Sequence, residues 1–171
     1  AAVIAGRLES LGGAADIAPP SAIVRMNDTP PEIGSSVVAR FRGTGSRRIL
    51  LLAHMDTVYL KGMLAQQPFR IDGDRAYGLG IADDKHGVAL ILHTLAVLRA
   101  LDARDYGLIT VLINGDEEVS SPGSRALITR LGREHDAVLS LEGAGADDRI
   151  RLTASGMGAV LLAESGRGAH A

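Results

Sequence analysis

The sequence predicts an α/β protein whose helices cover a largely parallel sheet. Two continuous apolar runs, at residues 49–53 and 108–113, are typical of strands that are buried on both faces of a covered sheet. A helical pattern lies between them, from about residue 87 to residue 100, and strands that alternate with helices indicate a layered domain. With 171 residues, 46% of them hydrophobic and 22% charged, the chain is long enough to bury a core.

Local patterns predict the remaining elements. Apolar residues at helical spacing predict a helix over residues 1–12, which Gly12 and Gly13 end. An Asp-Gly-Asp triplet at 72–74 predicts the turn of a hairpin that joins residues 69–71 to residues 76–77. Apolar or alternating runs predict the rest: strands at 22–24, 36–41 and 137–141, the last of them buried, a hairpin of 150–152 with 159–162, and a helix at 124–131.

Charge and composition argue against several classes of protein. The chain carries 18 basic and 20 acidic side chains, for a net charge of −2, and has no block of Lys or Arg. Nucleic-acid and membrane surfaces attract basic patches, so we expect neither as a partner. The absence of Cys excludes disulfides, thiolate metal sites and thiol nucleophiles, and leaves a cytoplasmic or a periplasmic compartment open. No apolar run approaches the roughly 20 residues that span a bilayer.

The pattern changes near residues 155–158, where an amphipathic strand begins. We therefore expect a catalytic domain over residues 1–155 and the beginning of a second domain over residues 156–171. The chain has neither an initiator Met nor a signal peptide at its start, and it stops directly after an alternating apolar stretch. These features lead us to expect that the sequence is a fragment of a longer protein.

Acidic and imidazole side chains follow each predicted buried strand. Ligand sites in open α/β sheets lie at the carboxyl ends of the strands, and carboxylates gathered there repel one another unless a cation holds them. One His and several carboxylates suit Zn²⁺, Co²⁺ or Mn²⁺. The residues are His54 and Asp56 after the first strand, Asp116, Glu117 and Glu118 after the second, Glu142 after the third, and Asp83 and Asp84 at the start of the long helix.

Two of these motifs have more than one interpretation. The strand period puts His54 and Asp56 on one side, where the carboxylate can accept one imidazole N–H and leave the other nitrogen for a metal; a turn with a solvated Asp56 fits as well. Residues 116–118 fit a solvated helix N-terminus, or a pair in which one Glu binds metal while the other takes a proton from water. Tyr59 and Lys61 can reach the site from the following loop, although ordinary loop packing fits them equally.

Four segments carry a resemblance to a known family: LLAHMDTVYLKG, GLGIADDKHG, INGDEE and SLEGAG. In this order they resemble the metal-site motifs of the dizinc aminoacylase and glutamate carboxypeptidase family, over about residues 49–171, and HMDTVYLKG through PFRIDGDRAYG points to its carboxypeptidase G branch. The resemblance implies a three-layer α/β/α zinc-exopeptidase-like domain with a largely parallel mixed sheet. It also implies that residues 156–171 begin an α+β lid, through which the full-length protein would form a homodimer.

The resemblance assigns a role to seven residues. It implies that His54 and Glu142 hold one zinc ion, that Glu118 holds a second and that Asp83 bridges the two, with a cis peptide between Asp83 and Asp84. Its catalytic residues are Asp56, which orients the imidazole, Glu117, the general base, and His170, a lid histidine that reaches the partner's active site and stabilises the oxyanion. The family usually has Gly where this chain has His86, so the local turn is expected to differ.

The implied activity is that of a metallocarboxypeptidase. It would cleave a C-terminal amide bond with a water that two zinc ions activate, cobalt or manganese being alternatives, and would release glutamate from folate-like or N-acyl-glutamate substrates. One alternative is an amidohydrolase of the same family, such as a deacetylase, a desuccinylase or an aminoacylase. Another is a metal-binding fragment without catalysis, because the family's last zinc-binding His and its substrate-carboxylate Arg would lie beyond Ala171.

Overall fold

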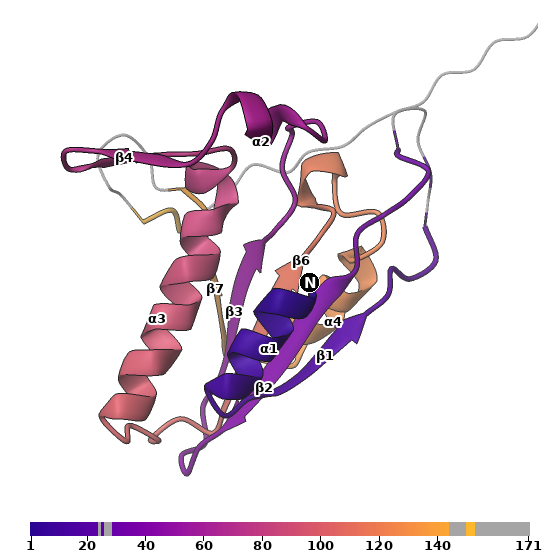
Figure 1. The fold of residues 1–171 in the computed structure, drawn as a ribbon. Helices are drawn as coiled ribbons and strands as arrows, with labels where there is room; N and C mark the ends of the chain where they lie inside the picture. The colour runs from indigo at the N-terminus through magenta and orange to yellow at the C-terminus, as the bar shows by residue number, and fades with distance from the viewer. Residues whose placement is uncertain (24, 26–28, 144–149, 153–171) are drawn as a thin grey trace, which may run out of the picture.

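The structure, a computed structural model, describes residues 1–23, 25, 29–143 and 150–152. They form a five-stranded sheet with helices on both faces and a small separate hairpin (Figure 1). The elements in chain order are α1 (Ala2–Ser10), β1 (Ala14–Ala18), β2 (Ser36–Arg42), β3 (Arg48–His54), α2 (Met63–Gln66), β4 (Arg70–Asp72), β5 (Arg75–Tyr77), the turn η1 (Ile81–Lys85), α3 (His86–Ala100), β6 (Leu108–Asn114), the turn η2 (Glu117–Val119), α4 (Arg125–Arg133) and β7 (Ala137–Ser140).

The strand order of the main sheet is β1-β2-β6-β3-β7. Strands β6, β3 and β7 run parallel, whereas β2 and β1 pair antiparallel at one side. In the parallel register His54 lies opposite Asn114, and Leu52 lies opposite Ser140. The residues that follow β3, β6 and β7 therefore leave the sheet at the same edge.

The sheet buries apolar side chains on both faces, which is why the central strands are continuously hydrophobic. On one face, Leu8 of α1 with Ile91 and Leu95 of α3 packs into the larger core. On the other, Leu131 of α4 packs against Val38, Leu50 and Leu112. The result is the three-layer α/β arrangement that the sequence predicts.

Most predicted elements are confirmed, and three predictions are wrong. Residues 22–23 are not in a strand; the edge strand is β1 instead, an Ala-rich segment held by its pairing with β2. The strand β7 is exposed rather than buried, since Val138 and Leu139 are 46% and 51% accessible at the edge of the described sheet. Residues 150–152 are not in a strand. The described residues do not include Val24 or residues 159–162, the predicted hairpin partner of residues 150–152. They also do not include residues 156–171, where the second domain is expected.

Within the described part of the chain, no helix is both long and apolar enough to cross a membrane. The longest described helix, α3, has 15 residues. Its two adjacent residues Leu90 and Ile91 differ sharply in their surroundings, with accessibilities of 50% and 1%.

This contrast gives a matched pair of variants. Replacing Ile91 by Ala leaves a cavity between α3 and the sheet, so the free energy of unfolding should fall by about 2–5 kcal/mol. The neighbouring change Leu90→Ala should alter it by only about 0.5 kcal/mol, because that side chain faces solvent. Urea unfolding followed by circular dichroism measures both. Equal losses would contradict the assignment of the buried face of α3.

Candidate metal centre

His54 lies at the end of β3 among carboxylates from four other segments. Its imidazole is 1% exposed. The nitrogen Nε2 is hydrogen-bonded to Asp83 Oδ1 at 2.8 Å and lies 3.5 Å from Glu142 Oε1 and 3.9 Å from Glu117 Oε2. The other nitrogen, Nδ1, lies 3.3 Å from Asp56 Oδ1. The structure thus brings together residues that are up to 88 positions apart, from His54 to Glu142.

Asp56 connects two parts of this centre. One carboxylate oxygen faces His54 Nδ1, and the other accepts a hydrogen bond of 3.0 Å from the backbone N–H of Glu118. The carboxylate is therefore bonded to the turn that carries the glutamates and lies beside the imidazole. Asp56 is on the Nδ1 side of the ring, and the other acids are on the Nε2 side.

The peptide bond between Asp83 and Asp84 is cis, as the resemblance implies, and the two side chains have different surroundings. Asp84 is fully buried, and its oxygens accept hydrogen bonds from the backbone N–H groups of His54, at 3.1 Å, and of Gly87, at 3.2 Å. Asp83 is 67% exposed and bonds only to the imidazole among the described hydrogen bonds. Asp84 is thus an anchor, whereas Asp83 is presented to a ligand.

The helix α3 starts close to this anchor because residue 87 is glycine. A Cβ atom at Gly87 would collide with Asp84 Oδ1 and with the carbonyl oxygen of Leu141. Its neighbour His86 places Nδ1 3.4 Å from Asp84 Oδ1. The substitution of His for the family's usual Gly at 86 is therefore accommodated beside the buried carboxylate.

Asp116, which the sequence pattern does not distinguish from Glu117 and Glu118, has a structural role. It is 1% exposed and accepts hydrogen bonds from the N–H groups of Gly123, at 2.7 Å, and Ser124, at 3.0 Å, and from Ser124 Oγ at 2.5 Å. These bonds close the loop that carries Glu117 and Glu118. The sequence offers no periodic signal for this role, because the partners lie seven and eight residues away in a loop.

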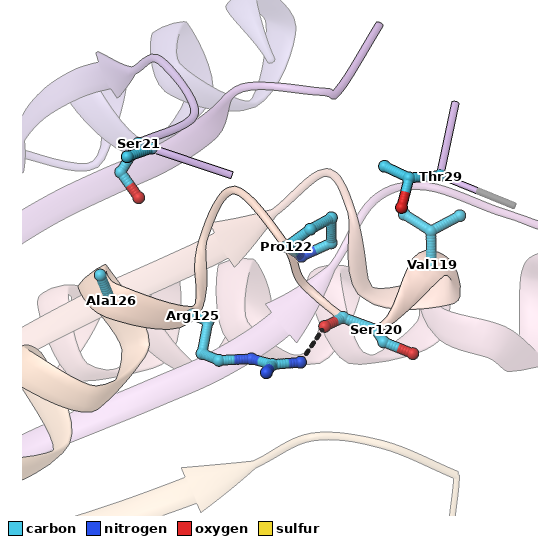
Figure 2. A pocket seen from close by; sticks show the side chains of 8 residues that line it. Ser21, Thr29, Val119, Ser120, Pro122, Arg125 and Ala126 are labelled. Carbon is cyan, nitrogen blue, oxygen red and sulfur yellow. Dashed lines mark hydrogen bonds between the residues drawn. The ribbon is translucent and has the colours of Figure 1, made fainter. Parts of the chain in front are cut away.

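The same loop is tied a second time by Arg125. Its guanidinium donates a hydrogen bond of 2.8 Å to the carbonyl oxygen of Ser120, which has a φ of 68° (Figure 2). A hollow of about 280 Å³ lies here, lined by Ser21, Ala22, Thr29, Val119, Ser120, Pro122, Arg125 and Ala126. Among the residues that the structure describes, no predicted metal ligand or catalytic residue lines it, so this hollow is separate from the metal centre.

The ionisation of the cluster reflects its crowding. Burial opposes protonation of His54, but the hydrogen bond and the charges of the surrounding carboxylates outweigh burial and raise its pKa; in decreasing order these are Asp83, Glu142, Asp56 and Glu117. Burial raises the pKa of Glu117 and of Glu142, and nearby carboxylates add to both shifts. Burial likewise raises the pKa of Asp84. Without a metal, the cluster therefore retains protons, which offset its negative charge. A bound cation would offset that charge in the same way.

The donors fit a divalent metal ion. Two groups have ligand atoms within 4.8 Å of one another: His54 with Asp84 and Glu142, and His54 with Asp83 and Glu118. Imidazole nitrogen and carboxylate oxygen are both zinc ligands. Of the predicted ligands, Asp83 and Glu118 lie with His54 in one group, and Glu142 lies with His54 in the other. The third donor of that other group is Asp84, both of whose oxygens already accept backbone hydrogen bonds. The predicted catalytic His170 lies outside the described residues.

Comparison with known proteins identifies the family. Residues 50–156 match peptidase family M20/M25/M40. The chain belongs to this family. Over 140 residues it is 51% identical to carboxypeptidase G2 of Pseudomonas sp. (strain RS-16). This aligned segment covers 81% of this chain and 34% of the relative. It is 34% identical over 128 residues to the succinyl-diaminopimelate desuccinylase of Gluconobacter oxydans (strain 621H), covering 68% of this chain and 29% of that one.

Two solved structures show the same fold. Human carnosine dipeptidase 1 superposes with a TM-score of 0.61 at 19% identity, and the metallo-carboxypeptidase Sso-CP2 of Sulfolobus solfataricus with 0.61 at 16%. Each match covers 84% of this chain and 32% of the other chain. This M20 chain thus spans about a third of the length of each of these four proteins.

The role of Asp116 can be tested by stability. The change Asp116→Ala would leave several buried donors unsatisfied, at about 1–3 kcal/mol each, so the free energy of unfolding should fall by at least about 2 kcal/mol. The matched change Asp16→Ala removes a carboxylate that is 78% exposed and should alter it by about 0.5 kcal/mol or less. Urea unfolding compares the two, and equal effects would show that Asp116 does not hold the loop.

Metal binding should depend on pH. A group whose pKa is raised by folding stabilises the folded chain fully at pH values below its ordinary pKa. This contribution is lost as the pH rises from the ordinary pKa through the raised pKa. The losses begin at 4.5 for Glu117 and Glu142 and at 6.5 for His54. The metal-free chain should therefore be less stable at pH 7.5 than at pH 5, and zinc should raise its Tm more at pH 7.5.

A calorimetric titration of the metal-free chain with zinc measures how many ions the chain binds. Both candidate groups use His54, so this chain alone should bind about one divalent ion firmly, since a tight zinc site takes three or four protein ligands. The variant His54→Ala should bind none firmly. Calorimetry of the metal-free chain measures both, and an equal zinc-induced gain in Tm at the two pH values would contradict the crowding of the centre.

Proposed function

We propose that the complete protein is a metal-dependent carboxypeptidase that hydrolyses a C-terminal amide bond and releases glutamate from N-acyl-glutamate or folate-like substrates. The observation that carries the proposal is the cluster around His54, in which Asp83, Glu117 and Glu142 approach one imidazole nitrogen. The 51% identity to a protein named carboxypeptidase G2 supports a carboxypeptidase.

The ligands that we propose are His54, Asp83, Glu118 and Glu142, which would hold two zinc ions per complete subunit. A divalent ion there would polarise the scissile carbonyl and lower the pKa of a water. Co²⁺ and Mn²⁺ suit the same donors. The orienting role that we propose for Asp56 is supported by its Oδ1, which lies 3.3 Å from His54 Nδ1 on the opposite side of the ring. The sequence offers Asp83 and Glu118 to a second ion, so the remaining ligands would come from outside these residues.

Glu117 is the proposed general base. Its Oε2 lies 3.9 Å from His54 Nε2, beside the proposed ligands, and its side chain is 48% exposed and so accessible to a substrate. Burial and the neighbouring acids raise its pKa, which suits a carboxylate that takes a proton from water and then gives it to the leaving amine. Glu118 is fixed differently, because its backbone N–H is bonded to Asp56.

The two adjacent glutamates give the decisive experiment. In the complete protein loaded with zinc, Glu117→Gln should lower kcat by at least about a hundredfold, because general base catalysis contributes about 10²–10⁴. Its metal content should not change. Glu118→Gln should lower the metal content as well, and the distant surface change Glu134→Gln should affect neither. Turnover that survives Glu117→Gln would remove Glu117 from the mechanism.

The relatedness to a desuccinylase keeps a second substrate class in view. Such an enzyme would use the same centre to remove an N-acyl group from another amino acid. Comparing kcat/KM for N-acyl-glutamates with that for N-acetyl and N-succinyl derivatives of other amino acids separates the two.

We propose further that a lid beginning at residues 156–171 forms a homodimer, in which His170 stabilises the oxyanion in the partner's active site. Sedimentation of the complete protein measures its oligomeric state.

A further inference from the structure

Three arginines from separate segments line one hollow at the end of the molecule opposite to the metal centre. Arg42 ends β2, Arg99 lies in the last turn of α3, and Arg104 follows that helix. With Asp102 they line a hollow of about 270 Å³, which we call the arginine hollow. Figure 1 shows the end of α3 and the loop after it at the bottom of the view, away from α2 and the β4–β5 hairpin. The helix has 15 residues, so about 22 Å of α3 separates the arginine hollow from the metal centre.

The lining of the arginine hollow is positively charged, whereas the chain as a whole is not. Its charged residues are three arginines and one aspartate, which give a net charge of +2, while the whole chain carries −2. The sequence has no block of Lys or Arg, so this local excess arises only when the chain folds. A cleft lined by charges of one sign raises the local concentration of the opposite ion. The arginine hollow therefore attracts anions.

Two of the three arginines have guanidinium groups available to a ligand. The Arg42 side chain makes no hydrogen bond or ion pair with the described residues. Arg104 pairs through Nε with Asp102 Oδ1 at 2.7 Å, and the two side chains are 65% and 78% exposed. Arg99 differs, because it donates a hydrogen bond of 2.5 Å to the carbonyl oxygen of Ser10 and so caps the end of α1. Arg42 and Arg104 are therefore the groups that an anion would contact.

Apolar side chains form the floor of the arginine hollow. Phe41 and Leu95 are 7% and 3% exposed and belong to the larger core, and Leu11, Leu98 and Tyr106 pack against that core. The hollow is therefore apolar at its floor, whereas its exposed rim is cationic. This arrangement fits an amphipathic anion, whose hydrocarbon part leaves water while its charged group stays at the surface.

Hydrogen bonds hold the walls of the arginine hollow in place. The carbonyl oxygen of Arg104 accepts two of them from Thr44, at 2.7 Å from the backbone N–H and at 2.8 Å from the hydroxyl group. These bonds tie the loop after α3 to the turn after β2. The backbone N–H of Ala103 donates to the carbonyl oxygen of Leu98 at 2.9 Å and closes the end of α3. A site whose walls are already ordered needs little rearrangement on binding, which favours affinity.

We propose that the arginine hollow is a binding site for a small amphipathic carboxylate. Arg42 and Arg104 hold the carboxylate, and the apolar floor holds a short alkyl chain. The volume of about 270 Å³ lies just below the roughly 300–1,000 Å³ of most ligand sites, so the ligand is small. Among the described residues, none of the proposed metal centre lines this hollow, and the site does not depend on the proposed function.

Three compounds separate the contribution of charge from that of the apolar floor. Octanoate, titrated calorimetrically into the complete protein, should bind at least about tenfold more tightly than acetate, which lacks the alkyl chain. It should also bind at least about tenfold more tightly than octanamide, which lacks the charge. The binding should survive removal of zinc with a chelator, which distinguishes it from a carboxylate bound to the metal. Equal affinities for the three compounds, or octanoate binding that is lost with zinc, would overturn the proposal.

Charge variants at the rim test the site in both directions. Arg42→Gln should weaken octanoate binding about tenfold, because it removes a charge-assisted hydrogen bond. Asp102→Asn should strengthen it about threefold, because it removes the acid of the rim and frees Arg104. Asp102 has a φ of 49°, which Asn also adopts, and a gain in affinity cannot arise from misfolding.

The matched control is Arg133→Gln, an exposed arginine of α4 that does not line the arginine hollow. Octanoate affinity should not change in this variant. Affinity that is unchanged in both Arg42→Gln and Asp102→Asn would overturn the proposal. A loss in Arg133→Gln equal to that in Arg42→Gln would also overturn it, because the effect would then come from net charge alone.

Discussion

Mutual repulsion among carboxylates at one edge of the sheet is the constraint on which the rest of this structure depends. Parallel pairing of β6, β3 and β7 sends three loops out at the same edge, and each loop delivers acids. Burial raises the pKa of Glu117 and of Glu142, and the charges of nearby carboxylates raise it further. Folding must therefore supply hydrogen bonds or cations to these groups, and the structure shows which acids accept backbone hydrogen bonds and which do not.

The acids divide into two kinds by the hydrogen bonds that they accept. Asp56, Asp84 and Asp116 each accept at least one backbone N–H, and these bonds fix the loops after β3, before α3 and after β6. A backbone donor neutralises part of the charge and also orders the chain. The side chains of Asp83, Glu117 and Glu142 lie around His54 Nε2 and are 43–67% exposed. The anchored acids thus position the presented ones, which remain available to a ligand.

The sequence predicts the parts of this arrangement that depend on pattern. Hydrophobic runs predict β3 and β6, and acids that follow such runs predict a cluster at their ends. Pattern does not distinguish Asp83 from Asp84, since the two are adjacent and differ only in the backbone groups that each reaches. It also misses β1, whose Ala-rich segment becomes a strand through its pairing with β2, and the exposure of β7, which depends on its place at the sheet edge.

Rigidity is distributed unevenly between the candidate metal centre and the β4–β5 hairpin. The proposed ligands extend from strand ends and from loops closed by buried carboxylates, whereas β4 and β5 form a separate pair of strands with no buried residue. A substitution in this hairpin changes few contacts of the sheet and so leaves His54 in place. Substitutions at Asp56, Asp84 or Asp116 act on the centre itself. The hairpin can therefore vary in sequence while the cluster around His54 keeps its geometry.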